Sequence, residues 1–261
     1  MSFISNYIDK LNRDKRKALS IFLTVGFPNK NNFVNLAKNI LDAGADMIEL
    51  GIPFSDPLAD GPIIQASSKI ALENMINLKD VFAISEHISS YSSKPVILMG
   101  YANPIRRYGM KNFFTDAANS GVKGLIVPDV PLDEYEEYFN STEMQFMGSK
   151  PDLILLTTPT SSDQRIREID AKSEGFVYCV SVSGITGVVN KYDESAIDNL
   201  KRSYSIIKKN KMMIGFGISK PEDIKNFSPF CDGFIVGSRI IKSIMDGERQ
   251  EETLNIISGL S

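Results

Sequence analysis

The sequence predicts a single α/β domain over residues 1–261, folded as a (β/α)8 TIM barrel with an extra N-terminal helix. Eight short apolar runs recur roughly every 30 residues, and stretches with helical periodicity lie between them. The runs are apolar almost throughout, which is typical of parallel strands covered on both faces. No linker rich in Pro, Ser or Gly and no block of charge divides the chain. A doubly wound sheet shares the same alternation, but the number of strands favours the barrel.

The elements follow from local pattern. The chain begins with a predicted helix whose apolar residues share one face, and we expect it to cap the bottom of the barrel. These residues are Phe3, Ile4, Tyr7, Ile8 and Leu11. The predicted strands are Leu19–Val25, Asp46–Leu50, Pro95–Met99, Gly124–Val127, Leu153–Thr157, Phe176–Val180, Met212–Phe216 and Gly233–Val236. The predicted helices between them include Asn31–Ala43, Leu78–Tyr91, Lys111–Ser120, Ser162–Lys172, Ser195–Lys209 and Pro221–Asn226.

One segment fits the barrel pattern poorly. Residues 138–150 stand where the fourth barrel helix is expected, but the run Asn140-Ser-Thr and Gly148 interrupt the helical periodicity. We therefore expect irregular local structure there, away from the motifs described below.

Composition excludes several classes of protein. The chain is 43% hydrophobic and carries 29 Lys and Arg against 32 Asp and Glu, a net charge of −3. Such a balance gives no broad basic surface, so nucleic acid is not an expected partner. No apolar run approaches the roughly 20 residues that span a bilayer, and the N-terminus does not resemble a secretory signal. Cys179 and Cys231 lie in apolar runs, as expected of a reducing compartment, so we predict a cytoplasmic protein with no membrane partner.

The supply of metal ligands and nucleophile partners is small. One histidine and two cysteines cannot form a zinc site of the usual nitrogen and sulfur ligands, so no metal is predicted. His87 lies in a predicted helix and is interpreted as a helix-surface residue rather than as part of a catalytic triad. Any catalysis must therefore depend on carboxylates, Tyr, Lys and backbone dipoles.

Glycine, proline and small polar residues follow most of the predicted strands, at the barrel end that carries active sites in this fold class. Two of these turns predict a phosphate site. Gly217 and Ser219 follow the seventh strand, and Gly237 and Ser238 follow the eighth, where loop amides and a helix N-terminus commonly bind phosphate. The turn 184–187 after the sixth strand could complete the site. A phosphorylated small metabolite is the expected ligand.

Two carboxylates near the second strand are candidates for acid–base chemistry. Glu49 alternates with Ile48 and Leu50, so its side chain is expected inside the barrel, where an unpaired carboxylate is costly. The alternatives are an outward Glu49 or one paired with a buried lysine. Asp60 lies in the following turn, where a turn-forming role before glycine is the alternative. In different surroundings, the two suggest a protonated glutamate and an ionised aspartate.

The motifs together resemble the α subunit of tryptophan synthase from about Phe22 to Ile241. The strings that carry the resemblance are IELGIPFSDPLADGPIIQAS, MGYANPI, VPDVPLDE, SVSGITG, GFGIS and IVGS, in this order. The resemblance implies a barrel enzyme, a carbon–carbon lyase of tryptophan biosynthesis. It cleaves indole-3-glycerol phosphate to indole and glyceraldehyde 3-phosphate by a retro-aldol reaction.

The family's site residues carry over motif by motif. Glu49 resembles the catalytic glutamate and Asp60 the catalytic aspartate. Phe22 and Tyr178 match aromatic residues beside the substrate, and Thr186 matches a residue of the loop that closes over it. The phosphate-binding positions correspond to Gly187, Gly217, Gly237 and Ser238.

The resemblance also implies a partner. The family works as an α2β2 heterotetramer in which indole passes to a β subunit, which uses pyridoxal phosphate to join it to serine; no cofactor is expected in the present chain. The expected partner-facing residues are Pro53, Phe54, Asp56, Asn103 and Asp129. For Phe54, a side chain tucked into the barrel mouth is an equal alternative.

Three other functions remain open. A related barrel that makes indole-3-glycerol phosphate would need a catalytic lysine inside the barrel, and no predicted strand carries one there. A free-standing lyase that releases indole would lack the partner. A barrel that only activates the β subunit would have lost its chemistry, against which Glu49 and Asp60 argue.

Overall fold

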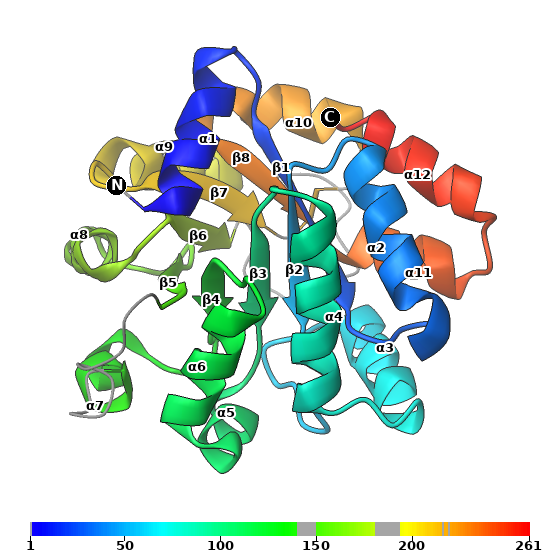
Figure 1. Cartoon of the computed structure of the whole chain (residues 1–261). Helices are drawn as coiled ribbons and strands as arrows, with labels where there is room; N and C mark the ends of the chain where they lie inside the picture. The colour runs from blue at the N-terminus through cyan, green and yellow to red at the C-terminus, as the bar shows by residue number, and fades with distance from the viewer. Residues whose placement is uncertain (1, 140–149, 181–193, 216, 219) are drawn as a thin grey trace.

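Eight parallel strands close into a barrel in the order β1 to β8 in this computed structural model, which describes residues 2–139, 150–180, 194–215, 217–218 and 220–261 (Figure 1). The strands are β1 (Ala18–Thr24), β2 (Met47–Gly51), β3 (Val96–Met99), β4 (Gly124–Ile126), β5 (Asp152–Thr157), β6 (Phe176–Val180), β7 (Lys211–Gly215) and β8 (Gly233–Val236). All eight lie where the sequence predicts strands, and pairing of β8 with β1 completes the ring. The barrel prediction is confirmed, and the doubly wound alternative is excluded.

Helices surround the barrel in an outer layer, apart from the first, which covers one end. They are α1 (Phe3–Arg13), α2 (Phe33–Asp42), α3 (Pro62–Glu73), α4 (Leu78–Tyr91), α5 (Ala102–Tyr108), α6 (Met110–Asn119), α7 (Tyr135–Phe139), α8 (Asp163–Lys172), α9 (Glu194–Ile206), α10 (Pro221–Phe227), α11 (Ser238–Met245) and α12 (Gln250–Ser258). Three short 3-10 turns accompany them, η1 (Lys30–Asn32), η2 (Leu132–Glu134) and η3 (Ser228–Phe230). The six predicted inter-strand helices are confirmed in place. Helix α3, which none of these predicted ranges covers, begins with Pro62 in the first helical turn, a position that tolerates proline.

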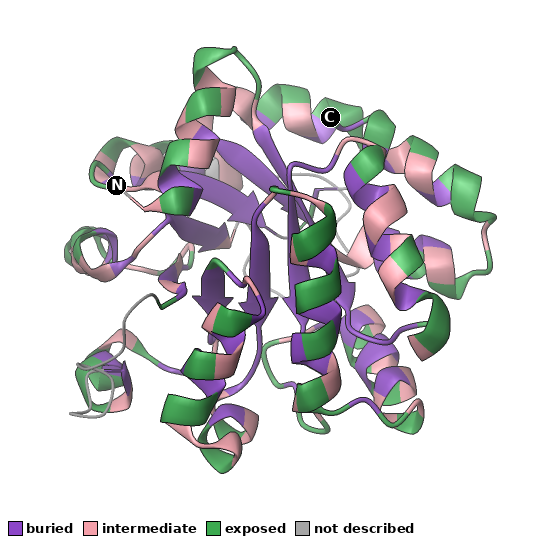
Figure 2. Cartoon of the chain, viewed as in Figure 1, coloured by how far each residue is buried: buried purple, intermediate pink, exposed green. Residues whose placement is uncertain are grey.

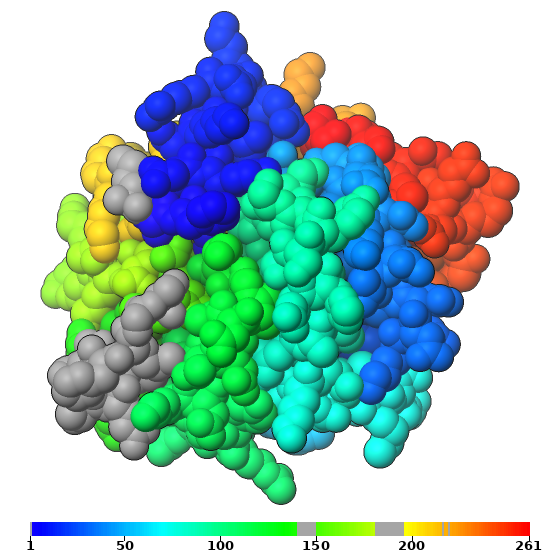
Figure 3. All heavy atoms as spheres, in the orientation of Figure 1, coloured from blue at the N-terminus to red at the C-terminus, as the bar shows by residue number. Residues whose placement is uncertain are grey.

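The core has two concentric layers. Strands β1, β2 and β3 are buried along their whole length, because one face fills the barrel interior and the other contacts the helices (Figure 2). The helices bury one face and expose the other, and α2, α4 and α6 form a continuous outer surface (Figure 3). At the closure of the ring, α12 packs against both α11 and α2.

Helix α1 covers the end of the barrel where the strands begin. Ile4 and Ile8 are fully buried, and a Cβ at Gly124, the first residue of β4, would lie 2.8 Å from the Ile4 side chain. The predicted cap at the barrel bottom is confirmed. Phe3 remains 49% exposed because it lies at the edge of the buried face, with Lys123 over its ring.

Several other predictions can be compared with this structure. His87 is exposed on α4, as predicted, and both cysteines are free and buried. In the poorly patterned segment 138–150, the short helix α7 ends at Phe139, and residues 140–149 lie outside the described residues. Among the helices that the structure describes, none is long and apolar enough to cross a membrane.

Candidate active site

The carboxyl ends of the strands meet at one end of the barrel, opposite α1 (Figure 1). The polar turns predicted to carry function follow the strands at this end. Because parallel strands all point the same way, residues far apart in sequence meet there.

Glu49 lies inside the barrel, at the centre of β2. Its side chain is fully buried, and its charge acts on Tyr178 of β6, on the far side of the ring, so the two residues face each other across the interior. The hydroxyl of Ser20 on β1 donates a hydrogen bond to Oε1 over 3.2 Å. Burial raises the pKa of Glu49 to about 8, and the hydrogen bond from Ser20 opposes this rise. The predicted inward orientation is confirmed, and the described residues provide no lysine partner.

Asp60 lies half-buried in the turn after β2. The hydroxyl of Tyr101, which follows β3, donates to Oδ2 over 2.8 Å and accepts the N–H of Ala59 over 3.1 Å. Burial raises the pKa of Asp60, and the hydrogen bond from Tyr101 opposes this rise; the net result is a pKa raised to about 6. Asp60 also forms part of the turn, because its own N–H donates to the carbonyl of Pro57. At neutral pH, Asp60 is therefore mainly ionised while Glu49 is mainly protonated.

Two aromatic side chains fill the mouth of the barrel above Glu49. Phe22 and Tyr178 are both buried, and the space for their rings is provided by glycine. A Cβ at Gly51 would collide with the ring of Phe22, and one at Gly215 with the hydroxyl end of Tyr178. The glycines at these strand ends therefore have a steric role, which the sequence analysis did not assign.

The predicted phosphate site is partly described. Helix α11 begins at Ser238, with Gly237 as its N-cap, so amides of its first turn that have no acceptor among the described residues are directed toward the barrel end. A Cβ at Gly237 would lie 3.1 Å from Cβ of Phe22, so this helix terminus is adjacent to the aromatic residues. Gly217 has a positive φ of 81°, which glycine adopts without strain. Thr186 and Gly187 lie outside the described residues, as does Ser219.

An apolar cavity of about 550 Å³ opens between the turns that follow β4 and β5. Its lining includes Ala59, the residue before Asp60, apolar side chains from β3, β5, β6 and the turn after β4, and polar side chains from the β5 turn and α8. The apolar side chains include Met99, Pro128, Val130 and Leu156. Neither Glu49 nor Asp60 lines this cavity, so it lies beside the two carboxyls rather than around them.

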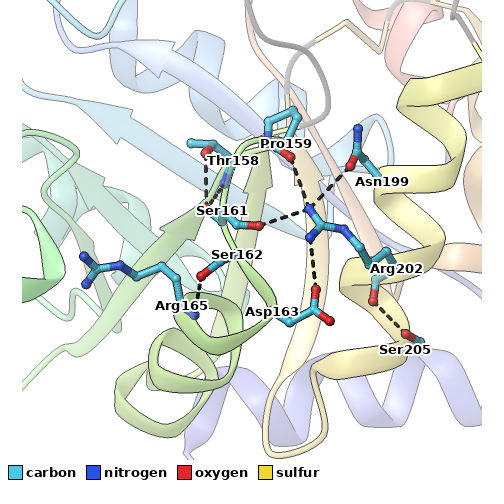
Figure 4. Close-up of polar contacts among 9 residues, drawn as sticks. All are labelled: Thr158, Pro159, Ser161, Ser162, Asp163, Arg165, Asn199, Arg202 and Ser205. Carbon is cyan, nitrogen blue, oxygen red and sulfur yellow. Dashed lines mark hydrogen bonds and ion pairs between the residues drawn. The ribbon is translucent and has the colours of Figure 1, made fainter.

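The wall of this cavity formed by the β5 turn is fixed in place by Arg202 of α9 (Figure 4). The guanidinium donates to the carbonyls of Pro159 and Ser161 over 3.1 and 3.0 Å, and pairs with Asp163 over 3.0 Å. Within the turn, the N–H of Thr158 donates to the hydroxyl of Ser161. The turn is therefore held by both its neighbours, α8 and α9.

The predicted partner-facing residues differ in exposure. Asp56, Asn103 and Asp129 are exposed, and Asp129 accepts the N–H of Ala102 at the start of α5. Pro53 is buried in the isolated chain. Phe54 is half-buried, with its ring 5.3 Å from that of Tyr101, so the tucked alternative describes it better than a fully exposed side chain.

Sequence reasoning missed two residues of this site, Ser20 and Tyr101. Ser20 lies inside an apolar run and has the same side-chain parity as Phe22 on the first strand, as Thr24 does. Tyr101 belongs to a motif that carried the family resemblance, but nothing local indicates that it reaches Asp60. Strand parity could have singled out the first, whereas the second required the tertiary structure.

Comparisons with known proteins agree on one group. The family model described as tryptophan synthase alpha chain matches residues 8–258. The tryptophan synthase alpha chain of Flavobacterium psychrophilum is 40% identical over 92% of this chain and 94% of its own length. That of Caldanaerobacter subterraneus is 39% identical over 97% and 95%.

Solved structures give the same result. The chain superposes on the tryptophan synthase alpha chain of Legionella pneumophila with a TM-score of 0.87, at 31% identity, covering 100% of this chain and 96% of the other. It is also similar to a chain of tryptophan synthase from Mycobacterium tuberculosis, solved in an aminoacrylate-bound form, with a TM-score of 0.86 and 27% identity over 100% and 98% of the two chains.

Proposed function

Because the chain belongs to the tryptophan synthase alpha chain family and is a lyase that cleaves indole-3-glycerol phosphate, we propose that Glu49 and Asp60 are the residues that carry out this cleavage. The proposal rests on the difference in burial and pKa between these two carboxyl groups. Full burial raises the pKa of Glu49 to about 8, whereas partial burial raises the pKa of Asp60, at the rim, to about 6, and Tyr101 donates a hydrogen bond to it. One group holds a proton at neutral pH and the other holds charge.

The retro-aldol step uses Glu49 twice. Breaking the bond at indole C3 requires a proton on that carbon, which protonated Glu49 donates as a general acid. The resulting carboxylate then accepts the proton of the adjacent side-chain hydroxyl as the carbon–carbon bond breaks. Glyceraldehyde 3-phosphate is released with a carbonyl at the former hydroxyl carbon, and Glu49 is protonated again.

Asp60 stabilises charge rather than moving the C3 proton. Protonation at C3 places positive charge on the indole nitrogen, and an ionised carboxylate beside it lowers the energy of that state. Tyr101 holds Oδ2 in position, which leaves Oδ1 to face the indole N–H.

Binding of the rest of the substrate is assigned to the mouth of the barrel. Phe22 and Tyr178 contact the indole and the side chain. The phosphate binds at the start of α11 and in the turns after β6 and β7. The residues proposed to bind it are Gly187, Gly217, Gly237 and Ser238, with Thr186 closing the site. No cofactor enters this chemistry, and pyridoxal phosphate belongs to the partner β subunit.

A β subunit is the proposed partner, in an α2β2 assembly. The proposed contact surface is the barrel rim around Pro53, Phe54, Asp56, Asn103 and Asp129. Its support is that three of these side chains are exposed on neighbouring turns. A role in tryptophan biosynthesis also supports a cytoplasmic location.

The test is indole release from indole-3-glycerol phosphate by the purified chain, with and without a β subunit. Slow release that rises sharply when the β subunit is added is the expected result. Fast release by the chain alone would identify a free-standing lyase. No release under either condition, with activation of the β subunit retained, would identify a regulatory barrel and contradict the roles of Glu49 and Asp60.

The phosphate site has a separate test. Gly237→Asp places a carboxylate at the start of α11, and we expect glycerol phosphate to bind at least tenfold more weakly, about 1.4 kcal/mol. Gly237→Ala is the matched control, because its methyl group meets Phe22 in the same way without adding charge. Equal affinity of the two variants for glycerol phosphate would show that the phosphate binds elsewhere.

A further inference from the structure

The hydroxyl of Ser20 is the one polar group on β1 that reaches the proposed catalytic glutamate. Its Oγ lies 3.2 Å from Oε1 of Glu49, and both residues are completely buried. In the register between β1 and β2, Phe22 pairs with Glu49 and Ser20 pairs with Met47. Ser20 therefore contacts the carboxyl from one layer deeper in the barrel, on the side away from the mouth.

The two oxygens of Glu49 have different surroundings. Oε1 accepts from Ser20, whereas Oε2 is buried and has no hydrogen-bond partner among the described residues. The hydroxyl of Ser20 makes no other hydrogen bond in the described part of the chain, so donation to Oε1 is what satisfies its O–H. A protonated carboxyl accepts best at the oxygen that carries no proton, which leaves the proton on Oε2.

We propose that Ser20 is a positioning residue for the cleavage: it anchors Oε1 of Glu49, so that Oε2 carries the proton transferred to the substrate. The inference rests on the proposed function of Glu49 and adds the residue that orients it. Without the anchor, the carboxyl can rotate and present its proton on either oxygen. Positioning of this kind matters because proton transfer requires the donor within hydrogen-bond distance of the reacting atom.

The same contact affects the titration of Glu49. Among the described residues, the titratable groups that face this region are Tyr178 on β6 and Asp60 beyond β2, and both are anionic when ionised. Ser20 is thus the neighbour that favours the carboxylate form, against a burial that disfavours it. Removing the hydroxyl should raise the pKa of Glu49 further.

The experiment is a pH profile of indole-3-glycerol phosphate cleavage for Ser20→Ala, Ser20→Thr and the unmodified chain. We expect Ser20→Ala to move the alkaline limb of kcat/KM upward by about one pH unit, as for loss of a hydrogen bond to a charged group. At neutral pH, kcat should fall about tenfold with little change in KM, because orientation rather than binding is lost. Ser20→Thr, which keeps the hydroxyl, should restore both. A ¹³C NMR titration of the Glu49 carboxyl, assigned by its absence in Glu49→Gln, gives the same shift independently of turnover.

A structural role for Ser20 would give a different pattern. Ser85→Ala is the matched control, since Ser85 is an equally buried hydroxyl that donates to the Val81 carbonyl within α4. An unmoved alkaline limb, with any loss of activity explained by stability as in Ser85→Ala, would overturn the inference. If Ser20→Ala does not fold, Ser20→Cys supplies a weaker donor of similar size and should shift the limb by a smaller amount. If the alkaline limb of the kcat/KM profile persists in Glu49→Gln, the proposed role of Glu49 itself is refuted.

Discussion

Two buried carboxylates of this chain have opposite surroundings. Asp170, at the end of α8, accepts three backbone N–H groups, from Lys208, Lys209 and Asn210, over 2.7 to 2.9 Å. The amide of the Asn210 side chain donates to it as well. Glu49, in the centre of β2, is more deeply buried but receives one hydrogen bond, and its Oε2 receives none.

The number of hydrogen-bond donors around each carboxyl distinguishes a structural role from a catalytic one. A carboxylate surrounded by donors stabilises the turn that supplies them, and Asp170 fixes the chain between α9 and β7 in this way. A carboxyl buried with a single neutral donor, as Glu49 is, is held in its neutral form and can give its proton to a substrate. The same functional group therefore contributes to stability in Asp170 and is available for reaction in Glu49.

The largest expected effect is the loss of cleavage on substitution of Glu49, the carboxyl proposed to react. Glu49→Gln keeps the size of the side chain and removes the transferable proton, so cleavage should fall about 10²–10⁴-fold while substrate still binds. Single-turnover kinetics and equilibrium binding measure the two quantities separately. A variant with near-normal kcat would show that the unsatisfied carboxyl is not the acid.

Asp60→Asn tests the neighbouring charge. The change keeps an acceptor for Tyr101 but removes the negative charge beside the indole nitrogen, and we expect kcat to fall about 10²–10³-fold. Tyr101→Phe is the companion variant, since it keeps the charge and loses the hydrogen bond, and a smaller loss is expected. If Asn is tolerated as well as Asp, charge is not what Asp60 supplies.

Substitution of Asp170, the carboxylate with a structural role, should lower stability rather than activity. Asp170→Ala leaves three partly buried N–H groups of the turn without their acceptor and should lower the free energy of unfolding by about 3 kcal/mol. The kcat of the folded fraction should stay close to that of the unmodified chain. Urea unfolding and the cleavage assay together check this, and a large loss of kcat without loss of stability would break the comparison.

The smallest effect is on the pH dependence of stability. Because the pKa of Glu49 is raised from 4.5 to about 8 on folding, the folded chain keeps a proton that the unfolded chain releases in this window. Stability from this group is therefore lost as pH rises between these values. Glu49→Gln removes the effect, so its stability relative to the unmodified chain should increase by about 2 kcal/mol between pH 6 and 7.5. Melting temperatures at several pH values test this, and a constant difference would mean that Glu49 is already ionised in the fold.

The sequence by itself determined the barrel and part of the site. Alternation of apolar runs with helical stretches is a local pattern, and it located all eight strands. Side-chain parity has a period of two along a strand, so it placed Glu49 inside the barrel without knowledge of its neighbours. The resemblance carried by the rim motifs led to the family, which the comparisons show.

Tertiary structure decided the contacts that set the chemistry. Tyr101 reaches Asp60 across 41 residues, and Ser20 reaches Glu49 across 29. Neither contact can be predicted from the neighbouring sequence, because each depends on the register of β1, β2 and β3 in the closed ring. Burial of Glu49 and partial burial of Phe54 also depend on groups from other strands and turns. The sequence thus specifies which way a side chain points, and only closure of the barrel determines what it meets there.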